Sequence, residues 1–171
     1  MRTFTASGYL LRYARIEVRL IYTGFLVMAC IGMLTMAGFQ LVHIGPTPER
    51  IAAYYRGGEV GGEMHFAKSV RELVEVTHFH SFIMGLVYLV MAHLFIATSI
   101  QAAAKRVFVL LGFAGLVGDL LSPWLIRYVS SSFAYALLLS WVAEWIGFAA
   151  FIAVPIAEMW FSRDRREFPP E

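Results

Sequence analysis

Four long apolar segments limit what this chain can fold into. They cover residues 18–42, 79–100, 107–126 and 133–161. Each is about 20 residues or longer, the length that an α-helix needs to cross a hydrocarbon core about 30 Å thick. None shows the short alternating pattern of membrane barrel strands. The sequence therefore predicts an all-α integral membrane protein, a four-helix bundle that forms a single membrane domain over residues 1–171.

The composition excludes a water-soluble domain of this size, because 59% of the residues are hydrophobic and only 15% are charged. The single cysteine, Cys30, lies inside an apolar segment, so no disulfide framework is expected. The net charge of +2 gives no support for binding nucleic acid. The His-Glu-x-x-His motif of zinc hydrolases is missing, and the sequence favours a protein that is not an enzyme. The lipid bilayer is the first partner that it predicts.

Basic residues predict the orientation, since cytoplasmic flanks of membrane helices carry an excess of lysine and arginine. With four spans, both termini and the loop after the second span fall on one side. We therefore expect a multi-pass protein of a bacterial inner membrane, with both termini cytoplasmic and a periplasmic loop over residues 43–78. The basic residues on the cytoplasmic side are Arg2, Arg12, Arg15, Arg19, Lys105, Arg106, Arg163, Arg165 and Arg166.

The periplasmic loop is predicted to be partly helical. Thr47 is a candidate N-cap with Pro48 at the first helical position, and Gly57 and Gly58 follow as a stop signal. The glycines beyond them predict a flexible hinge. From Glu63 onward the sequence can run as a helix into the second span.

The histidines of the second span can be placed by helical geometry, at about 100° per residue. His93 returns to about the azimuth of Glu75, and His78 lies about 60° from it. His80 points about 140° away from Glu75. One face therefore carries Glu75, His78 and His93, and His80 belongs to another.

The periplasmic mouth of the bundle contains side chains that ligate metals. Glu75-x-x-His78 has the spacing of carboxylate-bridged di-metal sites in helical bundles, although the second such motif is missing. Neutral imidazoles and carboxylates suit zinc, iron, copper or manganese. Histidines that merely solvate a helix end are the alternative. The candidate ligands of a divalent transition metal are His43, His65, Glu75, His78 and His80.

Haem is the other candidate cofactor. His78 and His93 lie on one face about 22 Å apart, and this pattern resembles the stacked haem ligands of membrane b-type cytochromes. The resemblance covers only the second span and implies haem b, with His43, His78, His80 and His93 as candidate ligands. The stretches AYYRGGE, ELVEVTHFH and AHLF are also similar to small uncharacterised bacterial inner-membrane proteins, to which no activity is attached.

Three polar side chains lie inside the predicted spans: His93, Asp119 and Glu144. Charged groups at such depth are costly, so they should face the bundle and find partners. We expect His93 to pair with Glu144, with Asp119 nearby. These residues either bond the helices together or form a path for protons, and the sequence leaves both interpretations open.

The first functional hypothesis is a small inner-membrane protein with a haem or metal site at its periplasmic mouth. It would serve an electron-transfer system and meet a periplasmic redox partner. One alternative is a non-catalytic structural or assembly subunit among other membrane subunits of a larger complex, with no cofactor. Another is a homo-oligomer that passes metal ions or protons.

Overall fold

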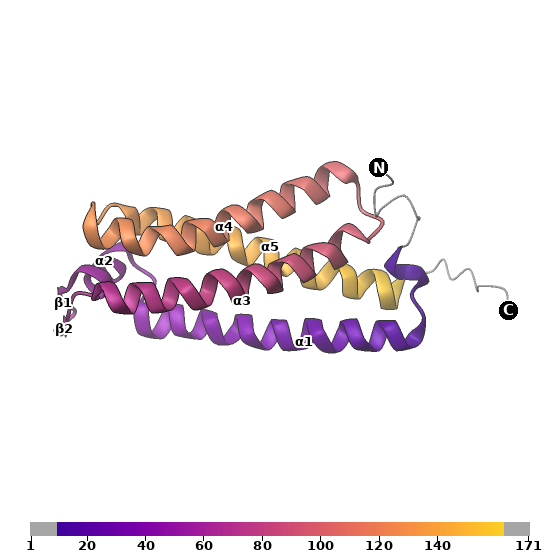
Figure 1. Cartoon of the computed structure of the whole chain (residues 1–171), viewed down its shortest axis with the longest axis horizontal. Helices are drawn as coiled ribbons and strands as arrows, with labels where there is room; N and C mark the ends of the chain where they lie inside the picture. The colour runs from indigo at the N-terminus through magenta and orange to yellow at the C-terminus, as the bar shows by residue number, and fades with distance from the viewer. Residues whose placement is uncertain (1–9, 163–171) are drawn as a thin grey trace, which may run out of the picture.

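The computed structural model describes residues 10–162 and shows a bundle of four long helices (Figure 1). This confirms the all-α prediction. A short helix and a two-stranded hairpin lie together at one end of the bundle, which we call the hairpin end. The elements are α1 (Ile16–Phe39), α2 (Pro48–Arg56), β1 (Gly58–Val60), β2 (Glu63–His65), α3 (Val70–Ile96), α4 (Ala102–Tyr128) and α5 (Phe133–Phe161). Arg2, Arg163, Arg165 and Arg166 lie outside the described residues.

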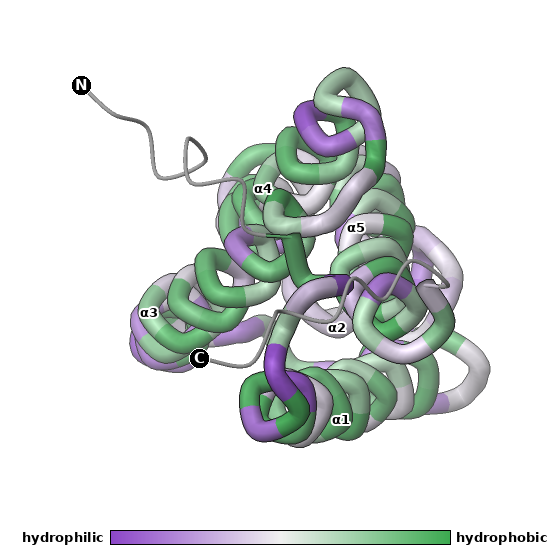
Figure 2. Tube along the Cα trace, turned by 90° about the vertical axis from the view of Figure 1, so that its right-hand side faces the viewer, coloured by the Kyte–Doolittle hydropathy of each residue, from purple (hydrophilic) through white to green (hydrophobic). Residues whose placement is uncertain are grey.

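Four helices, α1, α3, α4 and α5, are long and apolar enough to cross a membrane. Figure 2 shows hydrophobic positions along all four. Many large apolar side chains point away from the bundle, including Phe82, which is 71% exposed. Such a surface suits contact with lipid tails, which are as apolar as these side chains. The chain is therefore a multi-pass membrane protein in contact with the bilayer.

The helix that contains the second predicted span begins at Val70, where a capping box starts α3. The Ser69 hydroxyl accepts a hydrogen bond from the Glu72 backbone N–H, and the Glu72 carboxylate accepts one from the Ser69 N–H at 2.8 Å. These bonds satisfy backbone donors that the first turn leaves free. The helix α3 therefore begins before the predicted second span, 79–100, and ends at Ile96, and α4 extends beyond the predicted third span, 107–126, at both ends.

Thr47 caps α2 as predicted, since its hydroxyl accepts a hydrogen bond from the Arg50 N–H. The region after α2 differs from the prediction. Instead of a hinge and a continuing helix, β1 pairs antiparallel with β2. Gly61 and Gly62 form the turn between them at φ +63° and +82°, a left-handed conformation that glycine adopts without steric cost and that suits a tight hairpin.

The chain continues from α1 into a π-helical segment, Gln40–Ile44. A π-helical turn contains more residues than an α-helical turn and therefore changes the direction of the side chains. Gln40 is buried and accepts a hydrogen bond at 3.3 Å from the Trp145 indole of α5, whereas His43 is exposed. A second indole bond, from Trp160 to Thr23 at 2.9 Å, joins α5 to the other end of α1.

The most extensive helix contact joins α4 to α5. Gly112, Gly115 and Gly118 on α4 face α5 and α3, and Gly147 on α5 faces the α4 backbone. A Cβ atom at Gly115 would lie 2.7 Å from the backbone nitrogen of Glu144. These glycines therefore allow α4 and α5 to pack closely.

Candidate functional site

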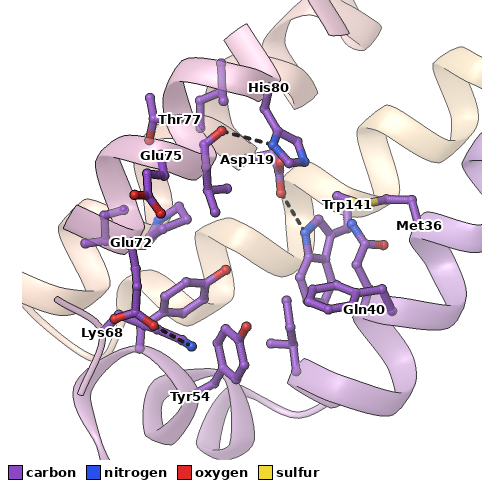
Figure 3. A pocket seen from close by; sticks show the side chains of 17 residues that line it. Met36, Gln40, Tyr54, Lys68, Glu72, Glu75, Thr77, His80, Asp119 and Trp141 are labelled. Atoms are coloured by element: carbon purple, nitrogen blue, oxygen red, sulfur yellow. Dashed lines mark hydrogen bonds and ion pairs between the residues drawn. The ribbon is translucent and has the colours of Figure 1, made fainter. Parts of the chain in front are cut away.

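A cavity of about 440 Å³ lies at the hairpin end of the bundle (Figure 3). All five helices contribute to its walls, and Met36, Phe39 and Leu120 belong to its apolar lining. The combination of an apolar lining and a few convergent polar groups is typical of a small-molecule site. The polar side chains of the lining are Gln40, Tyr54, Tyr55, Lys68, Glu72, Glu75, Thr77, His80 and Asp119.

Asp119 is fixed in the cavity wall by α5. The indole N–H of Trp141 donates a hydrogen bond of 2.8 Å to the Asp119 Oδ1 atom. A carboxylate has lone pairs for several hydrogen bonds, so this one contact leaves Oδ2 available to a ligand. The bond holds the carboxylate in one orientation at the junction of α4 and α5.

His80 presents an acceptor nitrogen to the cavity. Its Nδ1 atom lies 3.0 Å from the carbonyl oxygen of Val76. Because that oxygen can only accept, Nδ1 carries a proton, and Nε2 is the ring nitrogen that can accept a hydrogen bond or a proton. Figure 3 shows the His80 ring beside Asp119, on the same side of the cavity. Two acceptors from different helices therefore meet there.

Two tyrosines of α2 close the cavity toward the hairpin end. Burial raises the pKa of the Tyr55 hydroxyl above its ordinary value, and the nearby charge of Asp119 raises it further. Tyr55 therefore stays protonated and is a hydrogen-bond donor throughout the neutral pH range. The Lys68 ammonium lies 4.6 Å from the centre of the Tyr54 ring and 3.2 Å from Glu72, so it covers the rim.

Two arginines hold the segment around α2 against the bundle. Arg56 donates a hydrogen bond of 2.8 Å to the carbonyl oxygen of Ile126, and Arg127 donates one of 2.9 Å to that of Lys68. Ile51 of α2 is fully buried in a cluster with α5 residues. These contacts hold α2 in place over the cavity.

Comparison with known proteins identifies a family. Residues 45–166, most of the chain, match Aq_1264_TM, a family described as a transmembrane helical domain. The chain belongs to this family. No curated protein and no solved structure matches it. The region shared with Aq_1264_TM contains α2, α3, α4 and α5, and thus every cavity wall except the part that α1 supplies.

Of the five histidines predicted as ligands, only His80 lines the cavity. His43, His78 and His93 are exposed. The His43 ring packs edge-on against Phe39, and His78 packs against Phe79 and Phe82. His78 and His93 therefore point away from the bundle, whereas Glu75 lies with His80 in the lining of the cavity.

The predicted metal ligands do not meet. His65 lies in β2 with its Nε2 atom 4.0 Å from Glu63, and Glu75 forms an ion pair of 2.8 Å with Arg71. Within residues 10–162, no three histidine, cysteine, aspartate or glutamate side chains come close enough to hold a metal ion. The five residues are separated because β2, α3 and the π-helical segment point them in different directions.

The predicted pair of His93 and Glu144 is wrong. His93 is exposed, and its Nδ1 atom bonds to the carbonyl oxygen of Leu89 at 3.0 Å. Glu144 is buried inside the Aq_1264_TM domain, on the side of α5 that faces α4. Trp141 instead donates a hydrogen bond to Asp119, the other intramembrane carboxyl group.

Sequence reasoning missed Gln40, Tyr54, Tyr55, Thr77 and Trp141 as cavity residues. They come from four different helices, and none belongs to a short motif. The only local signal was the pair of aromatic residues on α2, beside a buried Ile51. Their side chains come together because α2 packs against the ends of α4 and α5.

Proposed function

We propose that this protein binds a quinol or quinone electron carrier in the cavity and works as a membrane component of an electron-transfer system. The observation that supports this most is the pairing of His80 with Asp119 in the wall of an amphipathic cavity. Quinols are membrane-soluble aromatic molecules with two hydroxyl groups. The cavity offers acceptors for hydroxyl groups, an aromatic surface for the ring, and apolar walls for a tail.

Both redox forms of such a ligand find partners. The hydroxyl groups of a quinol would donate to the Nε2 atom of His80 and the free oxygen of Asp119. The carbonyl oxygens of a quinone would accept from the Tyr55 hydroxyl. Met36, Phe39 and Leu120 supply an apolar lining for the tail. Oxidation of a quinol releases two electrons and two protons, and we assign the electrons to a redox protein on the periplasmic side.

A haem or a metal ion is a less favoured ligand of the same cavity. The free lone pair of His80 can coordinate iron, but His43, His78 and His93 do not reach the cavity. The structure thus offers one imidazole per chain, which fits a five-coordinate haem better than a two-histidine haem. An absorption spectrum of the purified protein distinguishes these cases, because a haem gives a Soret band that shifts on reduction.

We further propose that the hairpin end faces the periplasm of a bacterium and that both termini are cytoplasmic. The opposite end of the bundle carries Arg15, Arg19, Lys105 and Arg106, as the positive-inside rule requires of a cytoplasmic face. At the hairpin end, Arg50 is paired with Glu63 at 3.1 Å and Arg71 with Glu75 at 2.8 Å.

Cysteine labelling tests this orientation in a Cys30→Ser background. Glu59→Cys, on the exposed β1, is expected to react with a membrane-impermeant maleimide in intact cells. Gln101→Cys, in the exposed loop before α4, is expected to react only after the membrane is permeabilised. The opposite labelling pattern would reverse the orientation.

A binding assay with a short-tailed benzoquinone tests the proposed ligand. Quenching of tryptophan fluorescence reports the binding. His80→Ala removes an acceptor whose loss costs about 1–3 kcal/mol, which corresponds to a Kd raised roughly 5–100-fold. Asp119→Asn should weaken binding in the same range. The control is His43→Ala, an exposed histidine at the same end of the bundle, which should leave the Kd unchanged.

Two outcomes contradict the proposal. If neither the benzoquinone nor a naphthoquinone quenches the tryptophan fluorescence of the wild-type protein, the cavity does not bind quinones. If His80→Ala and His43→Ala bind the quinone equally well, the carrier lies elsewhere on the protein. In either case, a colourless and metal-free preparation would favour the structural or assembly subunit.

A further inference from the structure

Polar groups continue inward from the cavity into the centre of the bundle. Glu144 of α5 is 3% exposed, and Tyr88 of α3 is fully buried. The Tyr88 hydroxyl has no hydrogen-bond partner within the part of the chain that the structure describes. A buried hydroxyl without a partner costs about 1–3 kcal/mol, so a group that persists in this state calls for a functional explanation.

These residues form a connected series. His80 and Asp119 line the same cavity, and Trp141, about one helical turn before Glu144 on α5, donates a hydrogen bond to Asp119. Gly115, about one turn before Asp119 on α4, packs against the Glu144 backbone, and Gly112, about one turn further on, packs against the Tyr88 ring. Along α3, Tyr88 lies about 12 Å deeper than His80, at 1.5 Å per residue. The series therefore extends from the cavity wall toward the middle of the membrane.

The two carboxyl groups are suited to hold a proton. Two carboxylates close together in a medium of low dielectric repel each other, so the pair binds a proton in preference to carrying two charges. The titratable groups around Glu144 are Asp119 on α4 and Tyr88 on α3. His80 and Tyr55 act on Asp119 from α3 and α2, and α1 contributes the uncharged Gln40 through Trp145.

Aromatic side chains close the series on the side away from the cavity. The Tyr88 ring contacts Phe148 with a centroid distance of 4.6 Å, and Phe95 contacts Phe151 at 5.0 Å and Phe108 at 5.8 Å. Phe95 and Phe151 are fully buried. This layer contains no group that exchanges protons, so it separates Tyr88 from the opposite end of the bundle.

We propose that His80, Asp119, Glu144 and Tyr88 form a proton-exchanging series that opens only to the cavity, with Glu144 as its innermost proton store. Protons pass from solvent at the hairpin end to the Nε2 atom of His80, then to Asp119 and to Glu144. Each transfer moves one proton between existing groups, and no bond to carbon changes. The inference needs no bound ligand and is therefore independent of the proposed quinone.

Infrared spectroscopy of the reconstituted, ligand-free protein tests the store. Wild type is expected to show the C=O stretch of a protonated carboxyl group that shifts in D₂O. Glu144→Gln, which keeps the side-chain shape, should remove this band. The matched control is Glu158→Gln at the opposite end of α5, where the carboxylate accepts a hydrogen bond of 2.7 Å from Ser99, and it should keep the band.

The route and its direction are tested separately. His80→Ala should slow deuterium exchange of the band about tenfold or more, because a positioned proton carrier is lost. In vesicles of known orientation, a pH jump on the hairpin side should change the band, and a jump on the opposite side should not. A band that survives Glu144→Gln would overturn the store, and a response to the opposite side would overturn the one-sided series. Neither result depends on quinone binding.

Discussion

Gly115→Leu is expected to destabilise the protein more than any other glycine substitution on α4. A Cβ atom at this position would lie 2.7 Å from the Glu144 nitrogen and 2.9 Å from the Ser140 carbonyl oxygen. Both are backbone atoms, so α4 and α5 must move apart to relieve the clash. Overpacking of a core typically costs about 1–3 kcal/mol, and loss of the closest helix contact should reach or exceed the upper value.

The matched control is Gly85→Leu on α3. A Cβ atom there meets no atom within 4 Å, and leucine favours a helix by up to about 1 kcal/mol relative to glycine. Thermal unfolding in detergent, followed by circular dichroism, should show a large fall in Tm for Gly115→Leu and no fall for Gly85→Leu. Equal stability of the two variants would contradict the close packing of α4 on α5.

Phe151→Ala is expected to cost about 3–5 kcal/mol, the usual range for a large aromatic side chain removed from a packed core. Phe151 is fully buried and contacts Phe95 and Tyr88. Its loss leaves a cavity that neither lipid nor a neighbouring side chain can fill without moving a helix. The free energy of unfolding in mixed micelles measures this effect.

Phe82→Ala provides the comparison for a phenylalanine that faces outward, because Phe82 is 71% exposed. Lipid tails contact this position in the folded protein and also in the separated helix, so its truncation should change the free energy of unfolding by less than about 1 kcal/mol. In a water-soluble protein, replacing an exposed phenylalanine with alanine would instead increase the solubility. A large loss of stability with Phe82→Ala would indicate a protein contact on this face of α3.

The number and kind of spanning helices could be predicted from the sequence because apolar length alone determines them. The cap of α2 was also predictable, since Thr47 and Pro48 act on adjacent backbone groups. The start of α3 was not, because the sequence allowed a helix from Glu63 onward, whereas β2 occupies Glu63–His65 and α3 begins at Val70. Ser69 and Glu72 form the capping box that begins the helix there, and a search for that motif would have found it.

The helical geometry of α3 correctly separated His80 from His78 and His93. It could not show which face points inward, because α3 is apolar on both sides: Tyr88 and Met91 are buried, whereas Phe82 and Leu86 are exposed. In a membrane, hydrophobicity does not distinguish the core from the lipid surface. The choice of face is made by close contacts such as Tyr88 on Gly112, which depend on three helices at once.

The position of α1 has a consequence for biogenesis. Its two indole contacts join residues that are 105 and 137 positions apart in the chain, since both indoles belong to α5. As the ribosome makes the chain from its N-terminus, α1 enters the bilayer long before its docking partner is synthesised. A largely apolar helix can remain in lipid at little cost, and α1 can form these two contacts only after α5 has been made.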